Sequence, residues 1–69
     1  MTVNDILEMY DNWNTTVVVN DNNLREIARG KGYEIYHNND LVNLPVSSFG
    51  FYDGEFCIRV GVNVDVTEV

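Results

Sequence analysis

The chain has 69 residues, of which 45% are hydrophobic, and it carries eleven carboxylates against four bases, for a net charge of −7. This length allows a single domain, residues 1–69, with one modest core, and the apolar content excludes a disordered chain. No apolar stretch approaches the roughly 20 residues of a membrane span, and the first residues lack the features of a secretory signal. The single cysteine excludes an internal disulfide and fits a reducing compartment, so we expect a cytoplasmic protein without membrane attachment.

The first two expected elements are a short helix and a buried strand. Thr2 and Asp5 have the spacing of a helix-capping arrangement, and apolar residues recur one helical turn apart over residues 3–10. Residues 14–20 are rich in β-branched side chains, and their run of three valines indicates a central strand that is buried on both faces.

The middle of the chain gives weaker signals. A turn rich in Asn and Asp precedes residues 24–29, which suit either a strand or a helix of about two turns, and we favour the strand. Residues 31–37 predict a second short helix. The apolar residues within 41–44 are expected to close one end of the core before Pro45 begins an outer strand.

Residues 46–62 carry the strongest local signal. Asp53-Gly54 lies between two alternating apolar runs and predicts a type I′ hairpin turn, because both central positions of that turn need positive φ. The turn also sets a register that pairs Tyr52 with Glu55, Phe51 with Phe56, Phe49 with Ile58, and Ser47 with Val60. One face of the hairpin then carries Phe49, Phe51, Phe56, Ile58 and Val60, and the other carries Cys57 opposite Gly50.

These elements predict an α+β fold. A leading helix packs on the aromatic face of a small antiparallel sheet of three or four strands, which ends in the hairpin. The expected strands are 14–20, 24–29 if that segment is extended, 46–52 and 55–66. Because 46–52 is too short to cover 55–66, residues 62–67 should pair with another strand of the chain, pair with a partner, or fray, and Gly61 is a candidate bulge.

The succession of a short leading helix, a Val-rich strand, a connecting region and the hairpin from Val46 to Val60 resembles a group of small acidic proteins. These are encoded by phages and prophages of Gram-positive bacteria. The resemblance covers residues 2–62, implies the same helix-and-sheet layout, and brings no catalytic residue. Some acidic phage proteins of this size inhibit bacterial defence systems, including anti-CRISPR proteins that imitate nucleic acid. By analogy, the resemblance implies an inhibitor in the cytoplasm of the host bacterial cell.

The sequence predicts no catalytic, cofactor or metal site. His37 is the only histidine, and we expect it on the surface. Cys57 is the only cysteine, and its expected place within a strand is that of a small packed side chain. Gly30-Lys31-Gly32 is too short for a phosphate-binding loop. We therefore expect an interaction protein and not an enzyme.

Six residues are candidates for an interaction surface: Asp5, Glu8, Asp11, Tyr52, Asp53 and Glu55. The first three recur along one side of the leading helix, and the last three surround the hairpin turn. The acidic balance opposes direct binding of nucleic acid and favours a host protein with a basic surface. Two alternatives remain open. One is an ordinary solvated acidic surface, and the other is a homo-oligomeric module that assembles through Val62 to Val66.

Overall fold

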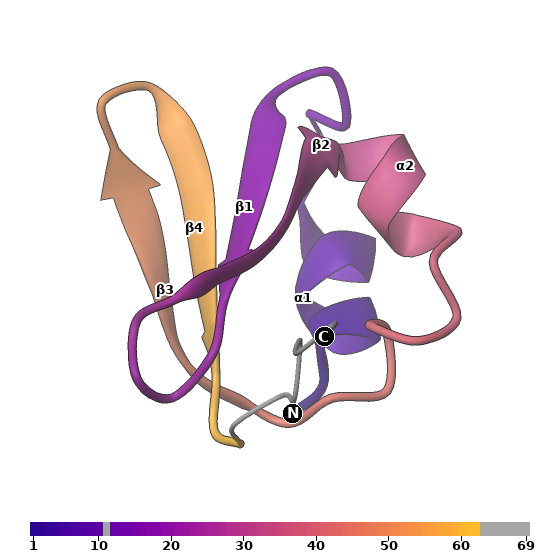
Figure 1. Ribbon diagram of the computed structural model, residues 1–69. Helices are drawn as coiled ribbons and strands as arrows, with labels where there is room; N and C mark the ends of the chain where they lie inside the picture. Colours follow the sequence, from indigo (N-terminus) through magenta and orange to yellow (C-terminus); the bar gives the residue numbers. More distant parts are fainter. Residues whose placement is uncertain (11, 63–69) are drawn as a thin grey trace, which may run out of the picture.

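The computed structural model describes residues 1–10 and 12–62, and this part of the chain forms two helices and four strands (Figure 1). In chain order they are α1 (Val3–Met9), β1 (Thr16–Asn20), β2 (Glu26–Lys31), α2 (Gly32–Tyr36), β3 (Val46–Tyr52) and β4 (Glu55–Val60). The strands form one sheet in the order β2-β1-β4-β3, and the two helices lie on the same side of it. The predicted α+β class is confirmed, and the ambiguous segment is a strand.

The sheet is mixed, so the prediction of a wholly antiparallel sheet is wrong for one pair of strands. β1 pairs antiparallel with β2, but it pairs parallel with β4, where Val17 lies opposite Phe56 and Val19 opposite Ile58. A parallel pair needs a long connection. Residues 21–54 supply it, because they contain β2, α2 and β3 between the two strands that they connect.

The β3–β4 hairpin has the predicted turn. Asp53 has a φ of 52° and Gly54 a φ of 80°, and the predicted pairs from Tyr52–Glu55 to Phe49–Ile58 are present. The predicted Ser47–Val60 pair is wrong, because the register shifts between Val46 and Ser48 and places Val46 opposite Val60. The irregularity in the register thus lies in β3, whereas Gly61, the candidate bulge, follows β4 and lies in a bend.

The shift in β3 has a physical reason at its first residue. The Val46 N–H donates to the Met1 carbonyl at 2.8 Å, and Thr2 forms an isolated antiparallel bridge with Pro45. The start of β3 is therefore bonded on its outer side to the beginning of the chain. One extra residue, Ser47, lets the backbone change direction before β3 pairs regularly with β4.

The core lies between the helices and the sheet. Its buried cluster consists of Val3, Ile6, Leu7, Val17, Val19, Ile35, Leu41, Phe56, Ile58 and Val60. On the predicted apolar face of the hairpin the β4 side chains are buried, but Phe49 and Phe51 are 55% and 56% exposed. The expected cover of the aromatic face is therefore incomplete, because β3 is an edge strand and α1 has only seven residues.

The capping arrangement predicted for α1 is confirmed. The Asp5 N–H donates to Thr2 Oγ1, and the Thr2 N–H donates to Asp5 Oδ2. The first two helical amides find distant acceptors, since Val3 donates to the Leu44 carbonyl and Asn4 to the Val42 carbonyl. The segment 41–44, predicted to close one end of the core, does so by contributing buried Leu41 and by capping α1.

The last strand is shorter than predicted. β4 ends at Val60, and the carbonyl of Val62 accepts a hydrogen bond from the Asn22 N–H at 3.0 Å. The rest of the stretch expected to pair elsewhere or to fray, residues 63–67, lies outside the described residues. Neither described helix is long and apolar enough to cross a membrane.

The turn geometry predicts that Gly54→Ala lowers the free energy of unfolding by about 1 kcal/mol, because a Cβ disfavours positive φ. No atom lies within 4 Å of the added Cβ, so the loss would come from the backbone alone. Gly61→Ala is the control, since its Cβ would make an ordinary 3.7 Å contact with Ser47. Urea unfolding followed by Trp13 fluorescence measures both. Equal stability of the two variants would contradict this account of the turn.

Candidate functional site

The structure describes five of the six predicted interaction residues and places them in two separate groups. Asp5 and Glu8 are exposed on α1, whereas Tyr52, Asp53 and Glu55 lie at the β3–β4 turn. In Figure 1 this turn is at the upper left of the sheet, and α1 lies on the opposite side of β1 and β4. The sixth residue, Asp11, lies outside the described residues. The five described residues therefore do not form one patch.

Two of the carboxylates on the helices are held in place by hydrogen bonds. Glu8 Oε2 accepts from the Tyr36 hydroxyl at 3.1 Å, which joins α1 to α2 and raises the pKa of Tyr36. Glu34 Oε1 accepts from the Lys31 N–H at 2.7 Å, at the start of α2. With the capping role of Asp5, three carboxylates on the helices have defined positions while their charges remain at the surface.

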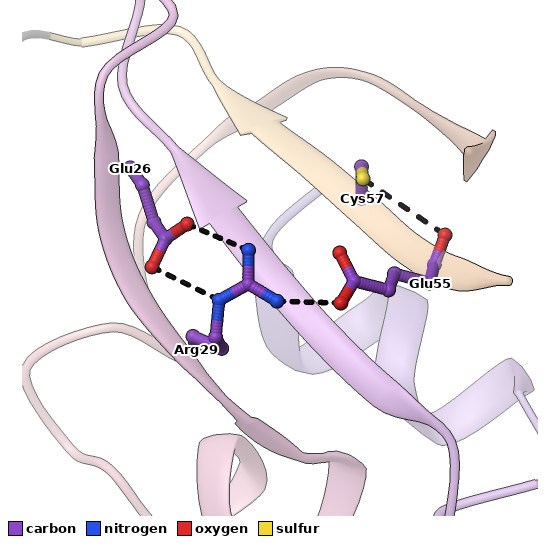
Figure 2. Close-up of polar contacts among 4 residues, drawn as sticks. All are labelled: Glu26, Arg29, Glu55 and Cys57. Carbon is purple, nitrogen blue, oxygen red and sulfur yellow. Dashed lines mark hydrogen bonds and ion pairs between the residues drawn. The ribbon is translucent and has the colours of Figure 1, made fainter. Parts of the chain in front are cut away.

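Glu55, one of the predicted interaction residues, belongs to an ion cluster. Arg29 extends from β2 across β1 and donates to Glu55 on β4 (Figure 2). The same guanidinium donates to Glu26 at 2.9 and 3.1 Å. The two carboxylates raise the pKa of Arg29, and Arg29 lowers the pKa of Glu26. This cluster lies on the sheet face opposite the helices, because Arg29 pairs with Val18 and not with the core-facing Val17 or Val19.

Cys57 lies beside this cluster, opposite Gly50 as predicted. Its thiol is half-buried, and its Sγ is 3.9 Å from the Glu55 carbonyl oxygen. Burial raises the pKa of the Cys57 thiol, and the negative charge of Glu55 raises it further. Since the thiolate is the nucleophilic form, these surroundings oppose nucleophilic chemistry at neutral pH.

His37 follows α2 and is exposed, as predicted, with its ring against the edge of Tyr36. Over residues 1–10 and 12–62, no three His, Cys, Asp or Glu side chains are grouped so that they could hold a metal ion.

Sequence reasoning missed the role of Asp21, which is fully buried. Its Oδ1 accepts from the backbone amides of Asn23 and Arg25, both at 2.9 Å, and its Oδ2 accepts from Arg25 Nε at 3.0 Å. The backbone hydrogen bond from Arg25 is the main reason that the pKa of Asp21 is lowered. The carboxylate thereby closes the β1–β2 loop, in which Leu24 has a φ of 65°. The only sequence signal is an aspartate four residues before an arginine within an Asn-rich turn.

The charges divide between the two layers of the fold. The strands and their connecting turns carry all four bases, Arg25, Arg29, Lys31 and Arg59, and also four carboxylates, Asp21, Glu26, Asp53 and Glu55. The helices and the α2–β3 loop carry four exposed carboxylates and no base: Asp5, Glu8, Glu34 and Asp40. We call this second set the acidic helical layer. The described excess of negative charge therefore lies on the helical side of the molecule.

A second surface lies where α1 ends over β3. Its hollow is lined by Ile6, Met9, Tyr10, Phe49, Gly50, Phe51 and Phe56. Tyr10 stacks on Phe56 with ring centroids 4.6 Å apart and contacts Phe51 at 5.8 Å. Met9, Phe49 and Phe51 are each more than half exposed. We call this surface, together with the outer side of β3, the aromatic edge. The sequence placed both phenylalanines on the core face but did not show that they lie at its open side.

Comparison of the chain with protein-family models, curated proteins and solved structures finds no match. The function must therefore be argued from the two surfaces described above.

The buried carboxylate predicts a pH dependence of stability. The folded pKa of Asp21 lies below its ordinary value of 3.8, so its contribution is present above that pH and is lost as the pH falls below it. We expect Asp21→Asn to lower the free energy of unfolding at pH 7 and to reduce its decline between about pH 5 and pH 2, where Glu26 accounts for part of the remaining slope. Asp40→Asn is the control for the loss of one charge. Urea unfolding measures the free energy of unfolding at each pH. If Asp21 contributed nothing, the curves of the wild type and of Asp21→Asn against pH would be parallel.

The surroundings of Cys57 predict slow alkylation. At pH 8 the folded protein should react with iodoacetamide roughly tenfold more slowly than the chain unfolded in urea, because burial raises the thiol pKa and limits access. The rate should still be rising with pH above the ordinary thiol pKa of 9.0. Mass spectrometry measures the reaction. Alkylation faster than in the unfolded chain would indicate an activated nucleophile and would contradict a non-enzymatic function.

Proposed function

We propose that this protein is a non-enzymatic inhibitor of the phage-encoded kind, which covers a basic, nucleic-acid-binding surface of a host protein with its acidic helical layer. The segregation of charge is the observation that carries the proposal. Four exposed carboxylates lie on the helices and the α2–β3 loop, which contain no base and border one, Lys31, at the start of α2, whereas the strands and turns carry equal numbers of bases and carboxylates. Duplex DNA carries one charge about every 1.7 Å, so a competitor for its binding site needs carboxylates gathered on one surface.

The positions of these carboxylates support the proposal. Asp5 and Glu34 are held by hydrogen bonds at the starts of α1 and α2, and Glu8 is held by Tyr36. Side chains that are already ordered lose less conformational entropy on binding than mobile ones. The remaining excess charge also attracts a basic partner over distances of about 10 Å at moderate salt and accelerates encounter.

The surroundings of Cys57 support the non-enzymatic part of the proposal. The thiol lies mid-strand with a raised pKa. Glu55 and Arg29, the two charged groups that most affect this pKa, form an ion pair with each other.

Capture from a bacterial lysate, followed by competition, tests the proposal. The immobilised chain is incubated with nuclease-treated lysate, and a captured protein is purified and titrated with the chain. We expect this protein to bind nucleic acid, to release the chain when a DNA duplex of about 20 base pairs is added, and to lose affinity steeply with salt. A complex that resists both DNA and salt would overturn the proposal.

Matched charge variants identify the surface that binds. Glu8→Gln with Asp40→Asn removes two charges from the acidic helical layer, and Asp53→Asn with Glu55→Gln removes two from the hairpin. Both double variants change the net charge by the same amount, so both should change the long-range attraction to a basic partner equally. We expect the helical pair to weaken binding of the captured protein about tenfold, against less than about threefold for the hairpin pair, in titration calorimetry at low salt. Equal effects would show that net charge alone matters and would contradict a role for the helical layer.

A further inference from the structure

The outer side of β3 has a short free stretch with defined ends. At one end the Val46 N–H is bonded to Met1, and at the other the chain turns at Asp53-Gly54. Between them, β3 pairs with β4 on its inner side only, among the residues that the structure describes. In a hairpin with a two-residue turn the closing pair, here Tyr52–Glu55, exchanges hydrogen bonds, and such pairs alternate with unbonded ones. The backbone groups of Phe49 and Phe51 therefore point outward.

From Ser48 to Tyr52 this edge has no charge, proline or bulge that would oppose pairing. β3 contains no charged residue from Val46 to Tyr52. The other edge of the same sheet, β2, contains Glu26, Arg29 and Lys31. Charged side chains on an edge strand oppose the addition of another strand, and uncharged edges permit it. The sheet can therefore be extended on the β3 side and is blocked on the β2 side.

The side chains at this edge are apolar as well as exposed. Phe49 and Phe51 are 55% and 56% exposed, and Met9 at the end of α1 is 64% exposed. These side chains line the hollow between α1 and β3. A strand added to β3 would satisfy the outward backbone groups and would cover the phenylalanines at the same time.

We propose that a second copy of this chain adds to β3, so that the two β3 strands pair antiparallel about a two-fold axis at Gly50. In this register Phe49 lies opposite the partner's Phe51, and the same pair recurs across the axis. Gly50 lies opposite the partner's Gly50, and Ser48 lies opposite the partner's Tyr52. The register uses the free stretch from Ser48 to Tyr52 and avoids both the bulge at Ser47 and the turn.

The edge fits a second copy because it is complementary to itself. Phe49 and Phe51 lie on either side of Gly50, so two β3 strands that pair antiparallel form two aromatic cross-strand pairs. Each such pair stabilises the shared sheet. The antiparallel arrangement also places the two Asp53 carboxylates at opposite ends of the interface, so that two chains of charge −7 meet through an uncharged strand. The charged β2 edge prevents further growth, and the assembly closes as a dimer.

The interface is small. Phe49, Phe51, Met9 and Tyr52 expose roughly 500 Å² per copy, to which the backbone adds, and this is at the low end for specific complexes. We therefore expect micromolar dissociation constants. Dimerisation uses β3 and leaves the acidic helical layer uncovered, so it can be tested independently of the proposed inhibition.

Sedimentation velocity of the full chain tests the dimer. At about 100 µM we expect a species with twice the chain mass of 7.9 kDa, which dissociates on dilution to about 1 µM. Phe51→Lys, which puts a charge on the edge, should weaken dimerisation at least tenfold. Tyr33→Lys, at an exposed aromatic on α2, is the control and should have no effect. A wild-type chain that stays monomeric at every concentration would overturn the proposal. The candidate occupant of the β3 edge would then be a strand of another protein.

Cysteine cross-linking tests the register. Gly50 lies at an unbonded antiparallel pair, where Cα atoms are about 4.5 Å apart and a disulfide can form. Gly50→Cys with Cys57→Ser should therefore form a disulfide-linked dimer under mild oxidation, and its Cβ would meet the Tyr52 ring at an ordinary 3.6 Å. Ser48→Cys with Cys57→Ser is the control, since two residues 48 would be about 13 Å apart. Equal cross-linking of both variants, or none at residue 50, would overturn the register.

Discussion

β1 lies in the middle of the sheet, and its parallel contact with β4 decides where the other parts of the molecule lie. The contact places Val17 and Val19 beside Phe56 and Ile58, and these side chains form the sheet side of the core. It also makes β3 the last strand of the sheet, because β3 can then pair only with the free side of β4. The core, the ion cluster across β1 and the exposed aromatic edge are all consequences of this one pairing.

The fold separates two kinds of surface that a small chain could easily have mixed. On the sheet and its loops, Arg29 and Arg25 are paired with carboxylates, so the fields of these groups largely cancel at a distance. The helices have no such compensation. The uncharged edge lies on a third side, at β3. One domain thus offers a charged surface suited to attraction and an apolar edge suited to tight packing, and neither has to serve both purposes.

Local signals in the sequence predicted local structure well. The capping of α1 by Thr2 and the turn at Asp53-Gly54 each depend on residues within four positions of one another, and both are confirmed. The parallel pair, the bridge from Arg29 to Glu55 and the shift at Ser47 depend on segments far apart in the chain, which no local pattern specifies. For the candidate site, the sequence named four residues that are exposed in the structure: Asp5, Glu8, Tyr52 and Asp53. It could not show that they belong to separate surfaces, because that depends on strand order.

The way in which α1 begins bears on the order in which the chain folds. A helix of seven residues has little stability of its own, and its first two amides are bonded to the carbonyls of Leu44 and Val42, about forty positions away. These acceptors take up their places only after the segment before β3 has docked. We therefore expect the nucleus to form around the local β3–β4 hairpin, and α1 to be completed late, although it is synthesised before the hairpin.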